Sequence, residues 1–119
     1  MPDALSVLQQ LRQRNPDITA AVLATNDGLA VHSDVADGVD ADVLAALAAD
    51  VAVRAARMAE DSGQGSARQV LVKADGGYVV ASRVGDDYCL AATAKAEASL
   101  GLLLISVRKA AGEIPTDAV

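Results

Sequence analysis

The sequence predicts a single α/β (α+β) domain over residues 1–119, in which a five-stranded antiparallel sheet is sandwiched between helices in the order α-β-β-α-β-β-β-α. Three observations predict this class. The chain has the size of one ordinary domain, its apolar residues alternate between helical and extended spacing, and short turn sequences rich in Gly, Asn and Asp separate the extended stretches. Because short turns join antiparallel neighbours, the strands should form one antiparallel sheet with helices on its faces.

A helix and a β-hairpin open the chain. Apolar side chains recur at helical spacing over residues 2–14, and Asn15-Pro16 ends the pattern. Residues 18–25 are apolar and include β-branched side chains, which favours a strand. Asn26-Asp27-Gly28 is typical of a tight turn because glycine accepts positive φ, and residues 29–33 continue as the second strand.

A long helix occupies the middle of the chain. Asp40 is a suitable N-cap because its carboxylate can accept hydrogen bonds from the first free backbone N–H groups. Helical spacing then continues to about Asp61, where the glycine-containing residues 62–65 end the helix.

Three strands and a final helix complete the order. Residues 69–74, 78–84 and 88–93 are short apolar stretches separated by turn sequences, which predicts an antiparallel meander. Over residues 95–112 the apolar side chains return to helical spacing, and Pro115 follows the end of that helix.

Composition argues against several classes of function. A net charge of -6 and an aromatic content of 2% disfavour nucleic acid, which needs clustered cations and stacking platforms, and the charge also disfavours anionic membranes. The lone Cys89 excludes an internal disulfide and indicates a reducing compartment. Residues 1–11 lack the order of a signal peptide, and no apolar run approaches the roughly 20 residues of a membrane span. We therefore expect a cytoplasmic protein without membrane insertion.

The long helix carries more apolar surface than one contact can use. Its charged side chains fall within about a third of the circumference, whereas a helix lying on one sheet needs an apolar stripe only somewhat wider than about 100°. A second contact is therefore expected. The large apolar residues gather on one side of the helix, and we assign that side to the sheet: Val43, Leu44, Leu47, Val51 and Met58.

Small residues line the adjoining side of the same helix and permit a second helix to approach closely. We assign this side to a homodimer interface, because a twofold axis makes such a patch self-complementary. The alternative is that alanine is simply a good helix former and that this side faces water. The predicted interface residues on the helix are Ala45, Ala48, Ala49, Ala52, Ala56 and Ala59.

The order and spacing of these elements resemble the Roadblock (dynein light chain) family, over roughly residues 4–114. The strand and turn Ile18-Thr-Ala-Ala-Val-Leu-Ala-Thr-Asn-Asp-Gly28 carry the likeness, together with the Ala-rich central helix, the strand over residues 88–93 and Ser99-Leu100-Gly101 followed by leucines. The resemblance implies a Roadblock/profilin-like fold. It also implies pairing through the central helix and the third strand, which adds Val70 and Val72 to the predicted interface.

The same resemblance implies a function without catalysis. Bacterial members like the gliding-motility regulator MglB bind Ras-like GTPases and act as GTPase-activating proteins, and other members are scaffolds or dynein light chains. No family catalytic residue is carried over to this chain, because such activation works by repositioning the GTPase's own residues.

Isolated reactive residues have ordinary explanations. No glycine begins a P-loop pattern, so the chain should not bind GTP by that route. His32, the single histidine, is interpreted as a surface or strand-end residue more readily than as a general base. Cys89 has no cysteine partner, which favours a buried structural thiol. We expect no catalytic residue, metal or cofactor.

The acidic pairs and the charged residues of the long helix also have ordinary explanations. The pairs Asp40/Asp42 and Asp86/Asp87 suit capping and turn formation better than a calcium site. Three side chains on its exposed arc are candidates to face a partner, namely Asp50, Arg54 and Arg57. An arginine could stabilise charge on a GTPase's phosphate, although Asp50 and Arg54 are spaced for an i,i+4 ion pair, which is the favoured interpretation.

The sequence thus supports a homodimer that binds a small Ras-like GTPase and modulates its nucleotide cycle. One alternative is a passive dimeric scaffold in a motor or signalling complex, to which the partner would bind whatever nucleotide it carried. Another alternative is a small-molecule sensor, since a sheet with helices can enclose a pocket.

Overall fold

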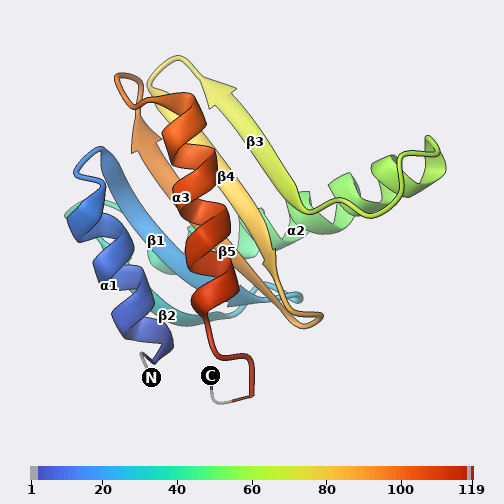
Figure 1. Cartoon of the computed structure of the whole chain (residues 1–119), viewed down its shortest axis with the longest axis horizontal. Coiled ribbons are helices and arrows are strands. Elements are labelled where there is room, and N and C mark those ends of the chain that lie inside the picture. Colours follow the sequence, from blue (N-terminus) through green and yellow to red (C-terminus); the bar gives the residue numbers. More distant parts are fainter. Residues whose placement is uncertain (1–2, 118) are drawn as a thin grey trace.

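The computed structural model describes residues 3–117 and 119, and it has three layers (Figure 1). α1 (Ala4–Arg14) and α3 (Leu100–Glu113) lie on one face of a five-stranded sheet, and α2 (Ala41–Asp61) lies on the other face. The strands lie in the order β2-β1-β5-β4-β3, and all neighbours are antiparallel. The predicted fold class and element order are confirmed. The strand bounds are β1 (Ile18–Thr25), β2 (Ala30–Val35), β3 (Gln69–Ala74), β4 (Gly77–Val84) and β5 (Tyr88–Lys95).

α1 is capped at both ends by side chains. The Asp3 carboxylate accepts a hydrogen bond from the Ser6 backbone N–H at 2.8 Å, and this bond lowers the pKa of Asp3. At the other end, Asn15 Nδ2 donates to the carbonyl oxygen of Leu11 at 2.8 Å. The predicted helix started at residue 2, which lies outside the described residues.

The first hairpin forms where the sequence predicts it. Gly28 supplies the positive φ of the turn, +94°. The turn is also tied to the β4–β5 turn, because Asn26 Nδ2 donates to the carbonyl oxygen of Asp86 at 2.8 Å. β2 begins and ends later than predicted, at Ala30 and Val35. Its pairing with β1 shifts between Leu23 and Ala24 and continues to Val35, which pairs with Ala20.

The start of α3 differs from the sequence prediction. The helical spacing predicted a start at Lys95, but Lys95 is the last residue of β5 and the helix begins after the N-cap Ser99. The backbone N–H of Lys95 donates to the carbonyl oxygen of Asp17 at 3.0 Å, which extends the strand pairing past Thr93. This pairing with a distant segment outweighs the local helical pattern.

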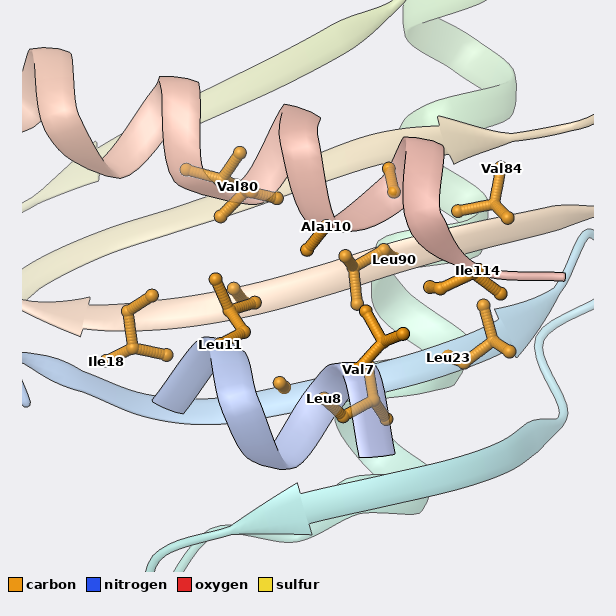
Figure 2. Packing of buried hydrophobic residues seen from close by; sticks show 14 of the residues in the cluster. Val7, Leu8, Leu11, Ile18, Leu23, Val80, Val84, Leu90, Ala110 and Ile114 are labelled. Atoms are coloured by element: carbon orange, nitrogen blue, oxygen red, sulfur yellow. The ribbon is translucent and has the colours of Figure 1, made fainter. Parts of the chain in front are cut away.

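The main core lies between the sheet and the α1/α3 layer (Figure 2). Leucine, valine, isoleucine and alanine fill it, and the two tyrosines pack only partly buried at its margin. The residues that Figure 2 labels in this cluster are Val7, Leu8, Leu11, Ile18, Leu23, Val80, Val84, Leu90, Ala110 and Ile114.

β3 is one edge of the sheet and is anchored to the α3 layer at its start. Gln69 Nε2 donates to Ser82 Oγ at 2.9 Å on β4 and to the carbonyl oxygen of Leu104 at 3.0 Å on α3.

No helix of the described residues is long and apolar enough to cross a membrane.

Candidate partner interface

The structure reverses the predicted faces of α2. The alanine side, expected at an interface, packs on the chain's own sheet: Ala45, Ala48 and Ala49 are 0%, 5% and 2% exposed. Most of the large side, assigned to the sheet, is instead exposed, with Leu47 at 61% and Met58 at 71%. Leu44 alone of the five is partly buried and packs beside Ala45. Ala45, Ala48 and Ala49 are thus covered within one chain and have no surface left for a second copy.

Close packing of small groups explains this orientation. Ala45 lies against Val22 and Ala24 of β1, so small side chains meet from both layers. The helix also approaches the first turn so closely that a Cβ added at Gly28 would lie 3.1 Å from the Ala46 Cα. The lack of a side chain at Gly28 permits this approach, while the small side chain of Ala45 permits close packing on β1.

Four exposed large residues share one side of α2, and we call them the α2 stripe: Val43, Leu47, Val51 and Met58. Val53 is also exposed, at 56%, but lies on another side of the helix. Beside the stripe, an apolar groove of about 190 Å³ separates α2 from β3 and β4. Every residue that lines it is apolar: Leu44, Leu47, Ala48, Val51, Val70, Val72, Val79 and Ala81. A contiguous apolar surface of this kind is typical of a protein–protein interface.

The groove continues into an open sheet edge. β3 pairs with β4 on one side only, and it ends the sheet. Val72 is 42% exposed and Leu71 is 38% exposed, so the edge carries apolar side chains as well as free backbone groups. In Figure 1 the C-terminal half of α2 projects beyond β3. The predicted interface residues Ala52, Ala56, Ala59 and Val70 are half-buried there, and Val72 is exposed.

A second hollow, of about 150 Å³, lies under the C-terminal half of α2. Ala52, Val70 and Cys89 line it, together with the more polar Asn26 and Arg83 among others. Cys89 itself is 3% exposed, and burial raises the pKa of its thiol to about 11. The prediction of a buried structural thiol is confirmed, since such a thiol stays protonated and unreactive at neutral pH.

The charged arc of α2 forms local ion pairs. Arg54 Nε lies 3.3 Å from Asp50 Oδ1, and Arg57 Nε lies 3.4 Å from Asp61 Oδ2, each one helical turn apart and exposed to solvent. The favoured ion-pair interpretation of Asp50 and Arg54 is confirmed. Exposed pairs of this type contribute at most about 1 kcal/mol, so they leave both arginines free to exchange partners.

The remaining residues singled out in the sequence are brought to no common site. Asp40 caps α2, because its Oδ1 accepts from the backbone N–H groups of Asp42 and Val43 at 3.0 and 3.2 Å. His32 is half-buried in β2, where it pairs with Leu23. Asp86 and Asp87 lie in the β4–β5 turn, as predicted.

Sequence reasoning missed the role of the large residues of α2. The available signal was the width of the apolar surface, which correctly indicated that α2 has two apolar faces. It did not indicate which face packs on the sheet, because both faces are apolar.

Comparison with known proteins agrees with this architecture. The chain is 32% identical to a Roadblock/LC7 domain of Streptomyces avermitilis of known structure, with a TM-score of 0.83 and coverage of 92% of each chain. MglB of Myxococcus xanthus shares 19% identity with a TM-score of 0.81, covering 91% of this chain and 88% of that one, which concerns the fold alone. An uncharacterized protein of Methanocaldococcus jannaschii, MJ0310, is 28% identical over 97 residues, 82% of this chain and 84% of its own length.

The family model described as the Roadblock/LC7 domain matches residues 5–94. These residues cover α1 except its first residue, the whole sheet except its last residue, and α2 with its exposed stripe. The chain therefore belongs to the Roadblock/LC7 domain family.

Proposed function

We propose that this protein is a homodimeric regulator without catalytic residues of its own, and that it binds a small Ras-like GTPase and modulates its nucleotide cycle. The observation that carries the proposal is the apolar surface formed by the α2 stripe, the groove beside it and the open edge of β3. One chain leaves all three exposed, and a second copy would cover them together.

The proposed dimer joins the two β3 edges across a twofold axis. The free backbone groups of each edge then gain hydrogen-bond partners, and the two sheets become continuous. The projecting half of each α2 lies over the other chain's sheet, so that Ala59 is covered along with Val70 and Val72. The α2 stripes meet beside the axis, in contact with the apolar grooves. This arrangement retains part of the interface predicted from the sequence. In the proposed interface the α2 stripe takes the place of Ala45, Ala48 and Ala49.

The GTPase partner rests on the family resemblance. The paired α2 helices would present an exposed arc with Asp50, Arg54 and Arg57 on each chain, a surface able to contact charged switch segments of a GTPase. Activation would then come from orienting groups of the GTPase itself. A passive scaffold would use the same surface without affecting hydrolysis.

Self-association is tested by sedimentation at micromolar protein. Leu47→Arg should convert the dimer to a monomer, because a charge placed in the apolar contact loses its water without gaining a partner. Ile105→Arg is the matched control, since Ile105 is 54% exposed on α3 and Leu47 is 61% exposed on α2. A wild-type monomer, or equal effects of the two variants, would contradict the proposed dimer.

The nucleotide cycle is tested with a purified small Ras-like GTPase from the same organism. We expect dimeric protein to bind it more tightly in the GTP state and to change its rate of single-turnover hydrolysis. Binding that is equal in the GDP and GTP states, with an unchanged hydrolysis rate, would support the scaffold in its place. Absence of binding in both states would remove both functions and would leave the dimer proposal intact.

A further inference from the structure

A second groove lies on the face of the sheet opposite α2, between α1 and α3. It consists of two adjoining hollows of about 270 and 100 Å³, which share Arg14, Asn15 and Leu102. Figure 1 shows the two helices side by side on this face. The proposed dimer surface is on the other side of the sheet, so the groove stays open whether or not two copies associate.

Polar contacts hold the shape of this groove. Ser106 Oγ of α3 donates to Asn15 Oδ1 at 3.2 Å, while Asn15 Nδ2 donates to the carbonyl oxygen of Leu11 on α1. Asn15 therefore ties the end of α1 to the middle of α3. A groove held in this way loses little conformational entropy when a ligand occupies it.

The floor of the groove is apolar and one wall is an exposed leucine. The floor consists of Val7, Leu11 and Ala110, which are buried in the main core. Figure 2 shows how these three residues pack. Leu102 is 58% exposed and lines both hollows. A leucine so exposed beside a preformed apolar floor can be covered by an apolar side chain of a partner.

The helices α1 and α3 are enriched in cationic side chains. α1 and α3 carry four of the ten cationic side chains and only one of the sixteen acidic ones, which leaves six cations and fifteen acids elsewhere. The two helices are thus positive in a protein of net charge -6. Their four cationic residues are Arg12, Arg14, Arg108 and Lys109.

Two of these cations line the groove. Arg12 is paired with Asp34 at 3.3 Å on the β2 side, whereas neither Arg14 nor Lys109 forms an ion pair among the residues that the structure describes. Glu113 lines one hollow and Asp17 lines the other, while Arg14 belongs to both. Arg14 therefore brings a cation to the shared middle of the groove, while the lining as a whole holds two cations and two acids above an apolar floor.

We propose that the α1/α3 groove binds an acidic, amphipathic segment of a partner protein. Apolar side chains of the segment cover Leu102 and the floor, and its carboxylates pair with Arg14 and Lys109. Helix-in-groove recognition combines apolar anchors with flanking charges in this way.

Other occupants fit the groove less well. A Pro-rich segment docks on aromatic side chains, and no aromatic residue lines either hollow. Recognition of an anionic membrane typically uses a cluster of 4–8 basic residues. The groove lining offers two cations, Arg14 and Lys109.

The test uses the full chain and a fluorescein-labelled amphipathic helical peptide of Glu and Leu, with the same peptide carrying Lys in place of Glu as its counterpart. Fluorescence anisotropy should show at least about tenfold tighter binding of the acidic peptide, and the affinity should fall as salt is added. Backbone NMR shifts should map binding to Asn15, Leu102 and Ser106.

Charge-reversal variants locate the site. Arg14→Glu with Lys109→Glu should weaken acidic-peptide binding by about tenfold or more, since two charge-assisted contacts become repulsive. Arg108→Glu changes the charge of α3 outside the groove lining and should alter the affinity less than about twofold. The monomeric Leu47→Arg variant should bind like wild type, which separates this proposal from the dimer.

Four results with the peptides would overturn the proposal. The acidic peptide could fail to bind, or both peptides could bind with equal affinity. The NMR shifts could be confined to α2, or Arg108→Glu could weaken acidic-peptide binding as much as the double variant does. Vesicles of phosphatidylcholine and phosphatidylglycerol form the last arm. The contrary result is that the protein binds these vesicles but not the acidic peptide, and loses vesicle binding in the Arg14→Glu, Lys109→Glu double variant. That result would assign the surface to lipid and would also overturn the proposal.

Discussion

At the scale of single residues, small side chains determine how closely the layers approach. Alanine between α2 and β1 permits a short helix–sheet distance, and glycine is required where the backbone itself comes into contact. Gly77 is the tightest such position. It opens β4 with φ +154°, and a Cβ there would overlap the carbonyl oxygen of Ala94 on β5.

Gly77→Ala should destabilise the fold by at least about 2 kcal/mol, because the added methyl group meets backbone that cannot move independently. Gly76→Ala is the control, since a Cβ at Gly76 would have no neighbour within 4 Å and the residue has no positive φ. Urea denaturation of both variants measures the difference. Equal stability of the two variants would show that the β4–β5 pairing can shift at no cost.

Cys89 should make stability depend on pH in the alkaline range. Burial raises the pKa of its thiol from the ordinary 9.0 to about 11, so between these values the folded chain holds one proton more than the unfolded chain. The stabilising contribution is therefore complete below pH 9 and is lost as the pH rises through 11, to a limit of roughly 2–3 kcal/mol.

The measurement compares denaturation of wild type and Cys89→Ala from pH 8 to pH 11.5, about the range set by the two pKa values. Other groups titrate in both proteins and cancel in the difference. We expect the stability gap between them to narrow with rising pH. A gap that stays constant would contradict the raised pKa of the thiol.

At the scale of elements, helix ends follow local chemistry and helix faces do not. Asp3 and Asp40 both cap their helices through side-chain oxygens. The sequence predicted the Asp40 cap, whereas it placed Asp3 within the first helix. The orientation of α2 about its own axis depends instead on the sheet beneath it. Both faces of α2 are apolar enough to pack on the sheet, and the face with the small alanine side chains is the one that does so.

Asp40→Ala should lower the free energy of unfolding by about 1 kcal/mol, because the N–H groups of Asp42 and Val43 lose their acceptor. Asp40→Ser should recover most of that loss, since a serine hydroxyl can accept the same hydrogen bonds. Chemical denaturation of the two variants is the measurement. An Asp40→Ala variant as stable as wild type would show that water replaces the cap fully.

At the scale of the whole molecule, three layers leave two unlike surfaces on opposite faces of one sheet. The α2 side has an apolar stripe, an apolar groove and an open strand edge, whereas on the other side the helices α1 and α3 carry four cations and one acid beside a narrow groove. The net charge of -6 conceals this division because the acidic side chains lie mostly outside α1 and α3.

Thermal stability should rise with protein concentration if the α2 side pairs two copies, since association stabilises only the folded chains. Calorimetry at increasing concentration should show an increasing Tm for wild type and for Ile105→Arg. Leu47→Arg should have a Tm that is independent of concentration. A concentration-independent Tm in wild type would contradict the dimer even if sedimentation suggested one.

The sequence by itself determined the number, type and order of the elements, and it indicated that α2 has surface for two contacts. Those properties depend on neighbours a few residues apart, through periodicity, turn residues and caps. The family resemblance further implies that two copies pair through β3 and α2.

Only the tertiary structure decided which face of α2 meets the sheet, where β5 gives way to α3, and that Arg14 and Lys109 share a groove. Each depends on contacts between segments distant in the chain: Gly28 against Ala46, Lys95 with Asp17, and Asn15 with Ser106. When two faces of a helix are both apolar, hydrophobicity cannot rank them, and the closeness of packing makes the choice.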